Sequence, residues 1–215
     1  MKYVLFIFLL SIYMLPACSQ SSSKTSNIST QKKVGGSCEG CEAIYANPIP
    51  FDKLSWIDTL PDFKEKGPKL MVSGVIYNPD GHTPAKNVVM YVYHTDQTGR
   101  YTNRNNEKGW SGRNGYIKGW IKTNEKGQFK FYTLRPASYP GSVIPAHIHA
   151  ILLEPGKTEY FIDEFLFDND PFLTTEQRNR QEGRGGNGIM KITMHNGMQT
   201  GTRTIYLGKN IPQYN

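Results

Sequence analysis

The chain has 215 residues, 38% of them hydrophobic and 20% charged, with a formal net charge of +7. Lys and Arg are scattered among Asp and Glu, apart from a cluster formed by Arg178, Arg180 and Arg184. A basic balance indicates nucleic acid or an anionic membrane surface only where the positive charges are concentrated. We therefore predict a solvated surface and no nucleic-acid partner.

Residues 1–17 are typical of an export signal. They begin with a positive charge at Lys2, continue as an apolar run to Leu15, and are followed by Cys18 in a Leu-Pro-Ala-Cys cleavage sequence. The run is too short for a membrane-spanning helix, which needs roughly twenty residues, and the polar stretch 19–33 disfavours a buried N-terminal helix. We expect Cys18 to be lipidated and to anchor the chain at the bacterial cell envelope, in the periplasm or at the outer membrane.

Two further stretches precede the predicted core. Residues 18–33 are rich in Ser, Thr, Gln and Lys and are predicted to form a lipidated, flexible tether. Residues 34–69 have a mixed composition with several Pro residues, and we predict an irregular N-terminal extension. Trp56 and Phe63 are its expected packing anchors.

Cys38 and Cys41 are the two cysteines that remain when Cys18 is set aside. An even pair in an oxidising compartment favours a structural disulfide. The alternatives are a redox pair, which lacks a surrounding thioredoxin-like pattern, and half of a zinc site, which lacks a second Cys pair.

Residues 70–215 are predicted to form one all-β domain, a β-sandwich core of mainly antiparallel strands. Short runs rich in Val, Ile, Tyr and Phe alternate with Gly, Pro, Asn and Asp turns, as is typical of such folds. The turn at 78–81 predicts a hairpin between the first two runs, and 174–181 is the one modest helical pattern. The predicted strands are 70–77, 88–94, 116–123, 128–134, 146–153, 160–167, 188–195 and 202–207.

The most specific local feature is a pair of histidines, His147 and His149, at the start of a predicted strand. Side chains two positions apart on a strand point to the same face, so both imidazoles project together while Ile148 packs on the other side. Such a pair forms half of a typical metal site. Taken alone, it is more often explained by solvated or hydrogen-bonded histidines.

Two tyrosines lie in loops upstream of these histidines. Tyr139 lies in the Pro- and Gly-containing loop 135–141, and Tyr101 follows Gly99 in the loop after the strand that ends at His94. Each tyrosine alone is typical of packing. The order of the three motifs is what indicates a metal site.

Together these motifs resemble the intradiol ring-cleavage dioxygenases, the non-haem ferric enzymes that include protocatechuate 3,4-dioxygenase and catechol 1,2-dioxygenase. The resemblance covers about residues 72–170 and includes the turn 80–84 and the segment 124–129. It implies one Fe(3+) ion, with Tyr139 as the ligand that leaves when substrate binds. The ligands implied by the resemblance are Tyr101, Tyr139, His147 and His149.

This ligand set suits ferric iron. Two phenolates and a hydroxide balance the charge of a hard trivalent ion, and two neutral imidazoles complete five-coordination, whereas zinc or ferrous iron more commonly has Cys or carboxylate ligands. The resemblance implies a catechol-type substrate, bound through both oxygens, whose ring O2 opens between the two hydroxyls to give a muconate-type diacid. The electrons come from the substrate, and no Gly-rich nucleotide fingerprint is present.

Two positions depart from the family pattern. Ile144 stands where well-studied members have an Arg three residues before the first ligand His, and Glu164 matches a family Gln. A cation replaced by an alkyl chain, and an amide replaced by an anion, change the electric field over the substrate. Arg100, Arg113 and Arg135 are candidate replacement cations, although each is more typical of a surface or loop.

The sequence supports two functions. The first is a ferric dioxygenase that opens the ring of a catechol-type substrate. The second is a non-enzymatic envelope lipoprotein that binds iron or a catechol-type ligand, which the departures at Ile144 and Glu164 favour. The extension 34–69 is too short for the helical region of dimeric catechol 1,2-dioxygenases, and the oligomeric state stays open.

Overall fold

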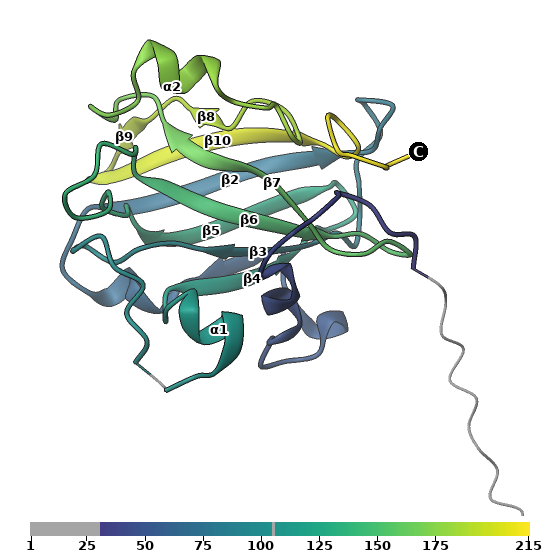
Figure 1. Cartoon of the computed structure of the whole chain (residues 1–215), viewed down its shortest axis with the longest axis horizontal. Helices are drawn as coiled ribbons and strands as arrows, with labels where there is room; N and C mark the ends of the chain where they lie inside the picture. Colours follow the sequence, from purple (N-terminus) through teal and green to yellow (C-terminus); the bar gives the residue numbers. More distant parts are fainter. Residues whose placement is uncertain (1–30, 105) are drawn as a thin grey trace, which may run out of the picture.

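Two five-stranded sheets stack face to face in the computed structural model, which describes residues 31–104 and 106–215 (Figure 1). Five of the eight strand pairs in this part of the chain are antiparallel, so the predicted all-β sandwich is confirmed. The first sheet contains, in spatial order, β1 (Ile57–Thr59), β5 (Gln128–Leu134), β2 (Lys69–Tyr77), β10 (Met198–Tyr206) and β9 (Thr193–His195). The second contains β4 (Lys118–Lys122), β3 (Val89–Tyr93), β6 (His147–Leu153), β7 (Tyr160–Phe167) and β8 (Ile189–Met190).

The core between the sheets follows from the alternation of apolar residues along each strand. On β6, Ile148 and Leu152 point inward and are fully buried. Phe131 of the first sheet meets Phe165 of the second edge to face, with ring centroids 5.9 Å apart. The same alternation leaves His149 on the outer face of the second sheet.

The N-terminal extension contains regular structure, which the sequence analysis did not predict. Strand β1 adds to the first sheet parallel to β5, and the chain forms two short 3-10 helices before it and one after it. Leu60 is buried in the main core, whereas the predicted anchors Trp56 and Phe63 are only half-buried. The 3-10 helices are η1 (Cys41–Tyr45), η2 (Phe51–Lys53) and η3 (Pro61–Lys64).

The extension covers one half of the outer face of the second sheet. Cys41 and Ile44 of η1 pack against Tyr91, Trp120 and Ile151. The Trp120 indole Nε1 donates a hydrogen bond to Ile44 O over 2.7 Å. This cover buries an aromatic surface that the sandwich alone would expose.

The predicted hairpin between the first two core strands is wrong. Strand β2 pairs with β5 and β10, whereas β3 pairs with β4 and β6 in the other sheet. The expected turn does form, since Gly81 N donates to Asn78 O over 2.9 Å and Ala85 N then donates to Ile76 O over 2.8 Å. Asn87, with φ of 61°, turns the chain towards the second sheet.

The remaining predictions about elements are mostly confirmed. Strands β5 and β7 have the predicted bounds, and the run 188–195 divides into β8 and β9. Helix α2 (Thr175–Asn179) lies within the predicted helical pattern, and α1 (Gly109–Arg113) was not predicted. In residues 31–104 and 106–215, no helix is long and apolar enough to cross a membrane.

The predicted signal peptide 1–17 and the lipidation site Cys18 lie outside the described residues. Of the predicted tether, the last residues are described, and Lys32 is joined to the domain: its N donates to Gly156 O, and Thr158 N donates to its carbonyl, each over 2.9 Å. The packed chain therefore starts before Val34.

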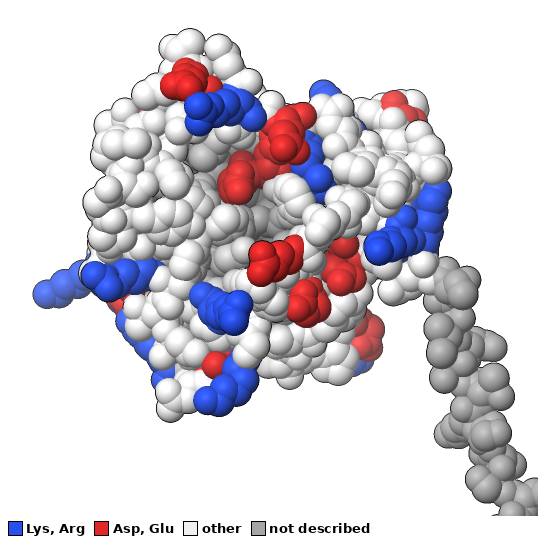
Figure 2. All heavy atoms as spheres, viewed as in Figure 1, with Lys and Arg blue, Asp and Glu red and all other residues white. Residues whose placement is uncertain are grey.

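Charge is unevenly distributed over the face that contains the outer surface of β6 and β7. Figure 2 shows Asp and Glu side chains around the hollow in the middle of this face, whereas Lys and Arg lie mostly towards its margins. The face is locally acidic although the whole chain is basic.

Candidate metal centre

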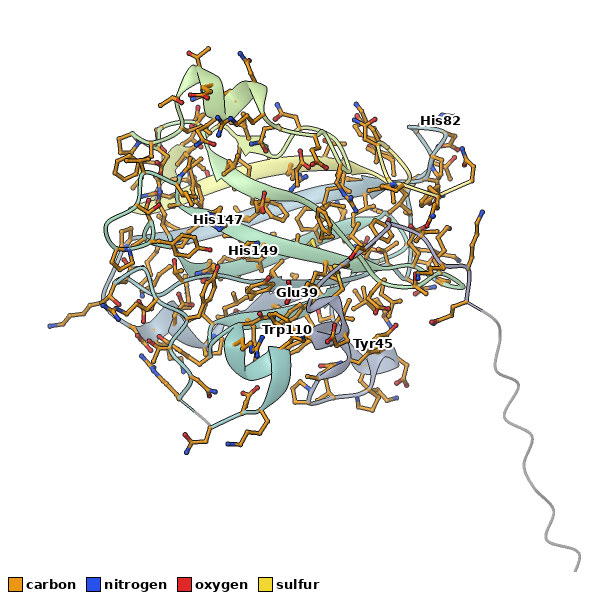
Figure 3. All side chains as sticks on the ribbon, in the orientation of Figure 1. Glu39, Tyr45, His82, Trp110, His147 and His149 are labelled. Atoms are coloured by element: carbon orange, nitrogen blue, oxygen red, sulfur yellow. A yellow bond between two sulfur atoms is a disulfide. The ribbon has the colours of Figure 1, made fainter. Side chains whose placement is uncertain are left out.

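Four side chains from three segments converge on the outer face of the second sheet, where β6 begins. Figure 3 labels the two histidines, His147 and His149, on this strand. Tyr139 Oη lies 2.8 Å from Tyr101 Oη and 3.1 Å from His147 Nε2. His149 Nε2 lies 3.2 Å from His147 Nε2 and 2.9 Å from Tyr101 Oη. The four contacts close a ring of two phenol oxygens and two imidazole nitrogens, all of them atoms that can bind a metal ion. The structure thus brings together all four side chains that the sequence analysis singled out.

The two imidazoles present lone pairs to the centre of this ring. His147 Nδ1 lies 2.7 Å from Pro145 O, so Nδ1 donates its proton and Nε2 is free. His149 Nδ1 faces the Glu164 carboxylate at 3.6 Å, which favours the same tautomer. Two lone pairs this close cannot hydrogen-bond to each other, whereas a cation between them binds both. The donor set therefore fits a metal ion.

Burial favours the neutral form of three of these donors, His149, Tyr101 and Tyr139. It lowers the pKa of His149 to about 3, with further lowering by His147 and His94, so the imidazole is in the neutral form that binds metals. Burial and the hydrogen bond with Tyr139 raise the pKa of Tyr101, and burial also raises that of Tyr139. Such phenols lose their protons only to a strong local charge, which a trivalent ion supplies better than a divalent one.

The loop that contains Tyr101 is fastened by Asp96. Its carboxylate accepts hydrogen bonds from Thr98 N over 2.8 Å and from Thr102 Oγ1 over 2.6 Å. Gly99 in this loop has φ of 74°, and a Cβ at that position would lie 2.1 Å from Ser138 O. The two tyrosine loops are therefore in direct backbone contact, which only glycine permits. Asp96 was missed in the sequence, although an Asp two residues before a Thr-Gly turn is a typical loop-fastening pattern.

Tyr93 is a second residue that the sequence analysis missed. It stands opposite His149 in the β3–β6 pairing, and the two rings stack with centroids 4.6 Å apart and planes 20° from parallel. Burial raises its pKa to about 12, so it remains a neutral phenol. The stacked ring fixes the orientation of the His149 imidazole.

A cavity of about 240 Å³ opens beside two of the four side chains. Tyr139 and His147 line it, together with both positions that depart from the family pattern, Ile144 and Glu164. The rest of the lining comes from Pro145, Leu166, Leu173, Gln177 and Gln181. No Lys or Arg is among these residues.

The candidate replacement cations lie elsewhere. Arg135 Nη1 donates to Asn169 Oδ1 over 2.8 Å, Arg113 stacks over the Trp110 ring, and Arg100 is exposed.

His94, directly after β3 and before the Tyr101 loop, is fully buried. Its Nε2 lies 2.7 Å from Thr133 Oγ1, and His94 does not contact any of the four converging side chains through this nitrogen.

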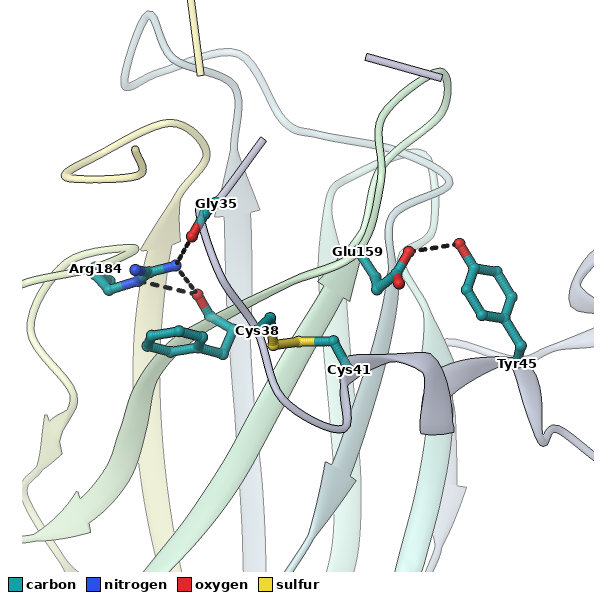
Figure 4. Close-up of a disulfide and its surroundings, with 7 residues drawn as sticks. Gly35, Cys38, Cys41, Tyr45, Glu159 and Arg184 are labelled. Atoms are coloured by element: carbon teal, nitrogen blue, oxygen red, sulfur yellow. Dashed lines mark hydrogen bonds between the residues drawn. A yellow bond between two sulfur atoms is a disulfide. The ribbon is translucent and has the colours of Figure 1, made fainter. Parts of the chain in front are cut away.

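Cys38 and Cys41 are joined as a disulfide at the start of η1 (Figure 4). The same figure shows Arg184 beside it, donating to Gly35 O over 3.1 Å and to Phe161 O over 3.0 Å. Arg184, one of the three clustered arginines in the sequence, is buried and ties the N-terminal extension to β7. The disulfide lies in the covered half of the outer face, away from the four converging side chains.

A dioxygenase family sequence model matches residues 45–183, more than half of the chain. The chain belongs to the intradiol ring-cleavage dioxygenase family. It is 27% identical over 138 residues to catechol 1,2-dioxygenase 1 of Acinetobacter lwoffii, a match that covers 57% of this chain and 42% of that relative. The chain thus matches less than half of the length of this curated relative.

Solved structures of other dioxygenases have a similar fold. Catechol 1,2-dioxygenase from Acinetobacter sp. ADP1 superposes with a TM-score of 0.55 at 18% identity, covering 72% of this chain and 57% of that one. The dioxygenase domain of a carbohydrate-binding fusion protein from Streptomyces sp. SirexAA-E gives 0.52 at 20% identity, covering 75% and 94%. An intradiol ring-cleavage dioxygenase from Tetranychus urticae gives 0.51 at 19% identity, covering 74% and 90%.

Proposed function

We propose that this chain is an intradiol dioxygenase that holds one ferric ion and opens the ring of a catechol-type substrate between its two hydroxyl groups. The ligands proposed are Tyr101, Tyr139, His147 and His149. The observation that supports this most directly is the closed ring of their donor atoms, with contacts of 2.8 to 3.2 Å, next to a cavity.

In the proposed reaction the bond between the two hydroxyl-bearing carbons breaks and both atoms of O2 enter the product as part of two carboxyl groups. The substrate supplies the electrons that reduce O2, so no separate reductant is needed. When bound, the ferric ion supplies Lewis acidity that favours the diol as its dianion.

Side chains of this protein take up the substrate proton, orient the histidines and contact the ring. Tyr139 is the tyrosine that lines the cavity, so we assign it the role of leaving as the diol binds and taking up a diol proton on its Oη. Pro145 O holds His147 in the metal-binding tautomer, and the Glu164 carboxylate, 3.6 Å away, favours the same tautomer of His149. Ile144 lines the cavity and offers the substrate ring an apolar contact.

Oxygen uptake by iron-loaded protein tests this proposal. A panel of catechols and hydroxyquinols is added under air, with the visible spectrum recorded in parallel and monohydroxylated phenols as controls. We expect one O2 consumed per ring opened and a product heavier by two oxygen atoms. Uptake that is absent for every diol contradicts the proposed activity.

A second function, binding of iron or a catechol-type ligand without turnover, is favoured by one observation. The cavity lining contains Ile144 and Glu164 and has no Lys or Arg to stabilise negative charge that develops on the ring and O2. The same experiment distinguishes the two functions, because a pure binder shows diol-induced spectral shifts without oxygen uptake.

We further propose that the chain is exported and lipid-anchored through Cys18 at the cell envelope. The sequence of residues 1–18 supports this, and the Cys38–Cys41 disulfide is typical of an oxidising compartment. Labelling with a fatty-acid analogue tests it. Wild-type protein should be labelled and sediment with membranes, and Cys18→Ala should lose both properties.

A further inference from the structure

A bulge in β7 places an acidic side chain beside the candidate metal centre. Ile148 pairs with Phe165 and Ala150 pairs with Ile162, so one residue of β6, His149, faces two residues of β7. Bulges next to active sites typically redirect a side chain. Here the two bulge residues, at positions 163 and 164, are both acidic.

The two acids of the bulge have different surroundings. Asp163 is buried and accepts hydrogen bonds from Gly183 N over 2.7 Å and Arg184 N over 3.2 Å. The Glu164 side chain is 42% exposed, and its carboxylate lies 3.6 Å from His149 Nδ1. Asp163 therefore holds the backbone, whereas Glu164 presents a carboxylate to the cavity.

The rest of the cavity offers no positive charge. Leu166 and Leu173 provide apolar walls, and Gln177 and Gln181 add neutral amides from α2 and the residues just after it. Among the lining residues, Glu164 is the one with a formal charge at neutral pH apart from the candidate ligands.

The arginines nearest to the bulge are bound elsewhere. Arg184 donates to the carbonyls of Gly35 and Phe161. Arg203 is buried, donates to Asp163 O over 2.6 Å and packs over the Phe165 ring. In the described part of the chain, no Lys or Arg forms an ion pair with Glu164.

The face that contains the cavity also bears acidic side chains, and the exposed Arg180, just after α2, is paired with Glu176. Acidic side chains gather over the middle of this face (Figure 2), so a cation approaching it is attracted even though the chain carries a net charge of +7. A carboxylated ring meets repulsion from the surface and from Glu164.

We propose that this cavity selects catechols with a positively charged amine on a short side chain, with the ammonium group placed against Glu164. This inference rests on the proposed function, since the ring is held through its two hydroxyls at the metal centre. Ile144 and the two leucines contact the ring and its methylene groups, while Gln177 and Gln181 accept further hydrogen bonds from the ammonium group.

Anaerobic titration of the iron-loaded protein tests the selection, with the visible spectral shift as the measure of binding. Three catechols of matched size are compared, with an aminoethyl, an ethyl or a carboxymethyl substituent. A half-exposed charge pair predicts that the amine binds about fivefold more tightly than the neutral catechol, and that the carboxylate binds more weakly. Raised salt should reduce the preference.

Two variants make the test specific to one side chain. In Glu164→Gln the ratio of amine affinity to neutral affinity should fall to about one. Glu176→Gln, an exposed position on α2 outside the cavity lining, is the matched control and should keep the wild-type ratio. An amine preference that is absent in the wild type, or that survives in Glu164→Gln, overturns the inference.

The two proposals fail in different ways. If no catechol shifts the spectrum, the proposed metal centre fails and the selection fails with it. If the neutral catechol binds and is opened while the amine gains no affinity, the proposed function stands and only the selection is wrong.

Discussion

The outer face of the second sheet has two halves built from the same strands, and they differ in what covers them. In one half, Tyr91 of β3 and Ile151 of β6 lie under η1 of the N-terminal extension. Two residues away on each strand, Tyr93 and His149 stack beside the tyrosine loops and a cavity. The strands therefore supply one continuous platform, and the segments laid over it decide which half is a hydrophobic core and which is a candidate metal centre.

Removing a ligand from the open half should have the largest effect. His149→Ala deletes one of the four donor atoms. We expect iron affinity to fall by more than about a hundredfold, because loss of a ligand should cost more affinity than loss of a residue that hydrogen-bonds to a ligand. The free energy of unfolding of the metal-free protein should change by much less, because the side chain lies on the outer face of the second sheet and not in the core between the sheets. Metal analysis after dialysis measures the first effect and urea unfolding the second. Retention of stoichiometric iron contradicts the assignment.

Truncation of a side chain in the covered half should lower stability and leave iron binding intact. Trp120→Ala removes a buried indole and its hydrogen bond to Ile44 O, which should lower the free energy of unfolding by about 3–5 kcal/mol. Iron binding should persist under native conditions. Trp120→Phe is the matched control, since it keeps most of the ring and loses about 1 kcal/mol with the hydrogen bond. Equal losses in both variants argue against the packing account.

Beneath the open half, a buried polar chain predicts a pH effect. His94 Nε2 lies 2.7 Å from Thr133 Oγ1, which lies 2.8 Å from Asp62 Oδ1. Burial lowers the pKa of His94 from 6.5 to about 4. Between these values the unfolded chain binds a proton that the folded chain does not, so acidification from pH 6.5 to 4 removes up to about 3 kcal/mol of stability.

Asp62 opposes this loss, and a variant separates the two effects. Burial raises the pKa of Asp62, so on acidification the folded state takes up this proton before the unfolded state does and gains stability. Asp62→Asn removes this compensation while resembling the protonated acid in shape. Urea unfolding between about pH 4 and 6.5 should therefore show a steeper loss in the variant than in the wild type. If the variant and the wild type lose stability equally as the pH falls, His94 and Asp62 do not have opposing effects.

The smallest effect is expected for the disulfide in the covered half. Cys38 and Cys41 close a loop with a sequence separation of 3, for which the chain-entropy relation gives about 2 kcal/mol. Reduction, or the double change Cys38→Ser and Cys41→Ser, should lower stability by that amount and leave iron binding unchanged. A loss of iron on reduction shows instead that the two halves are coupled.

The contrast between the halves also separates what the sequence predicts from what it does not. Strand alternation places His147 and His149 on one face, and the order of the tyrosine and histidine motifs identifies the four converging side chains. The cover is harder to predict, because Ile44 O accepts its hydrogen bond from Trp120, 76 positions away, and Leu60 N donates to Tyr132 O. No local pattern encodes such pairings.

Two further features escaped prediction for physical reasons. A turn at 78–81 specifies a reversal of the chain but not which strand pairs next. The sequence therefore does not predict that β3 crosses to the other sheet. The bulge at Asp163 and Glu164 has no glycine to mark it, and its effect depends on the register with β6. Sequence thus indicates that Glu164 is unusual, and the bulge explains why its carboxylate lies at the cavity.

The visible spectrum of the iron-loaded protein tests the central claim most directly, because charge transfer from a tyrosinate to ferric iron absorbs visible light. Wild-type protein loaded with one ferric ion should be coloured. Tyr101→Phe and Tyr139→Phe should each shift or weaken the band, whereas Tyr132→Phe, a half-buried tyrosine on β5 in the first sheet, should leave it unchanged. A colourless iron-bound protein, or a band that neither loop tyrosine alters, contradicts the proposed metal centre.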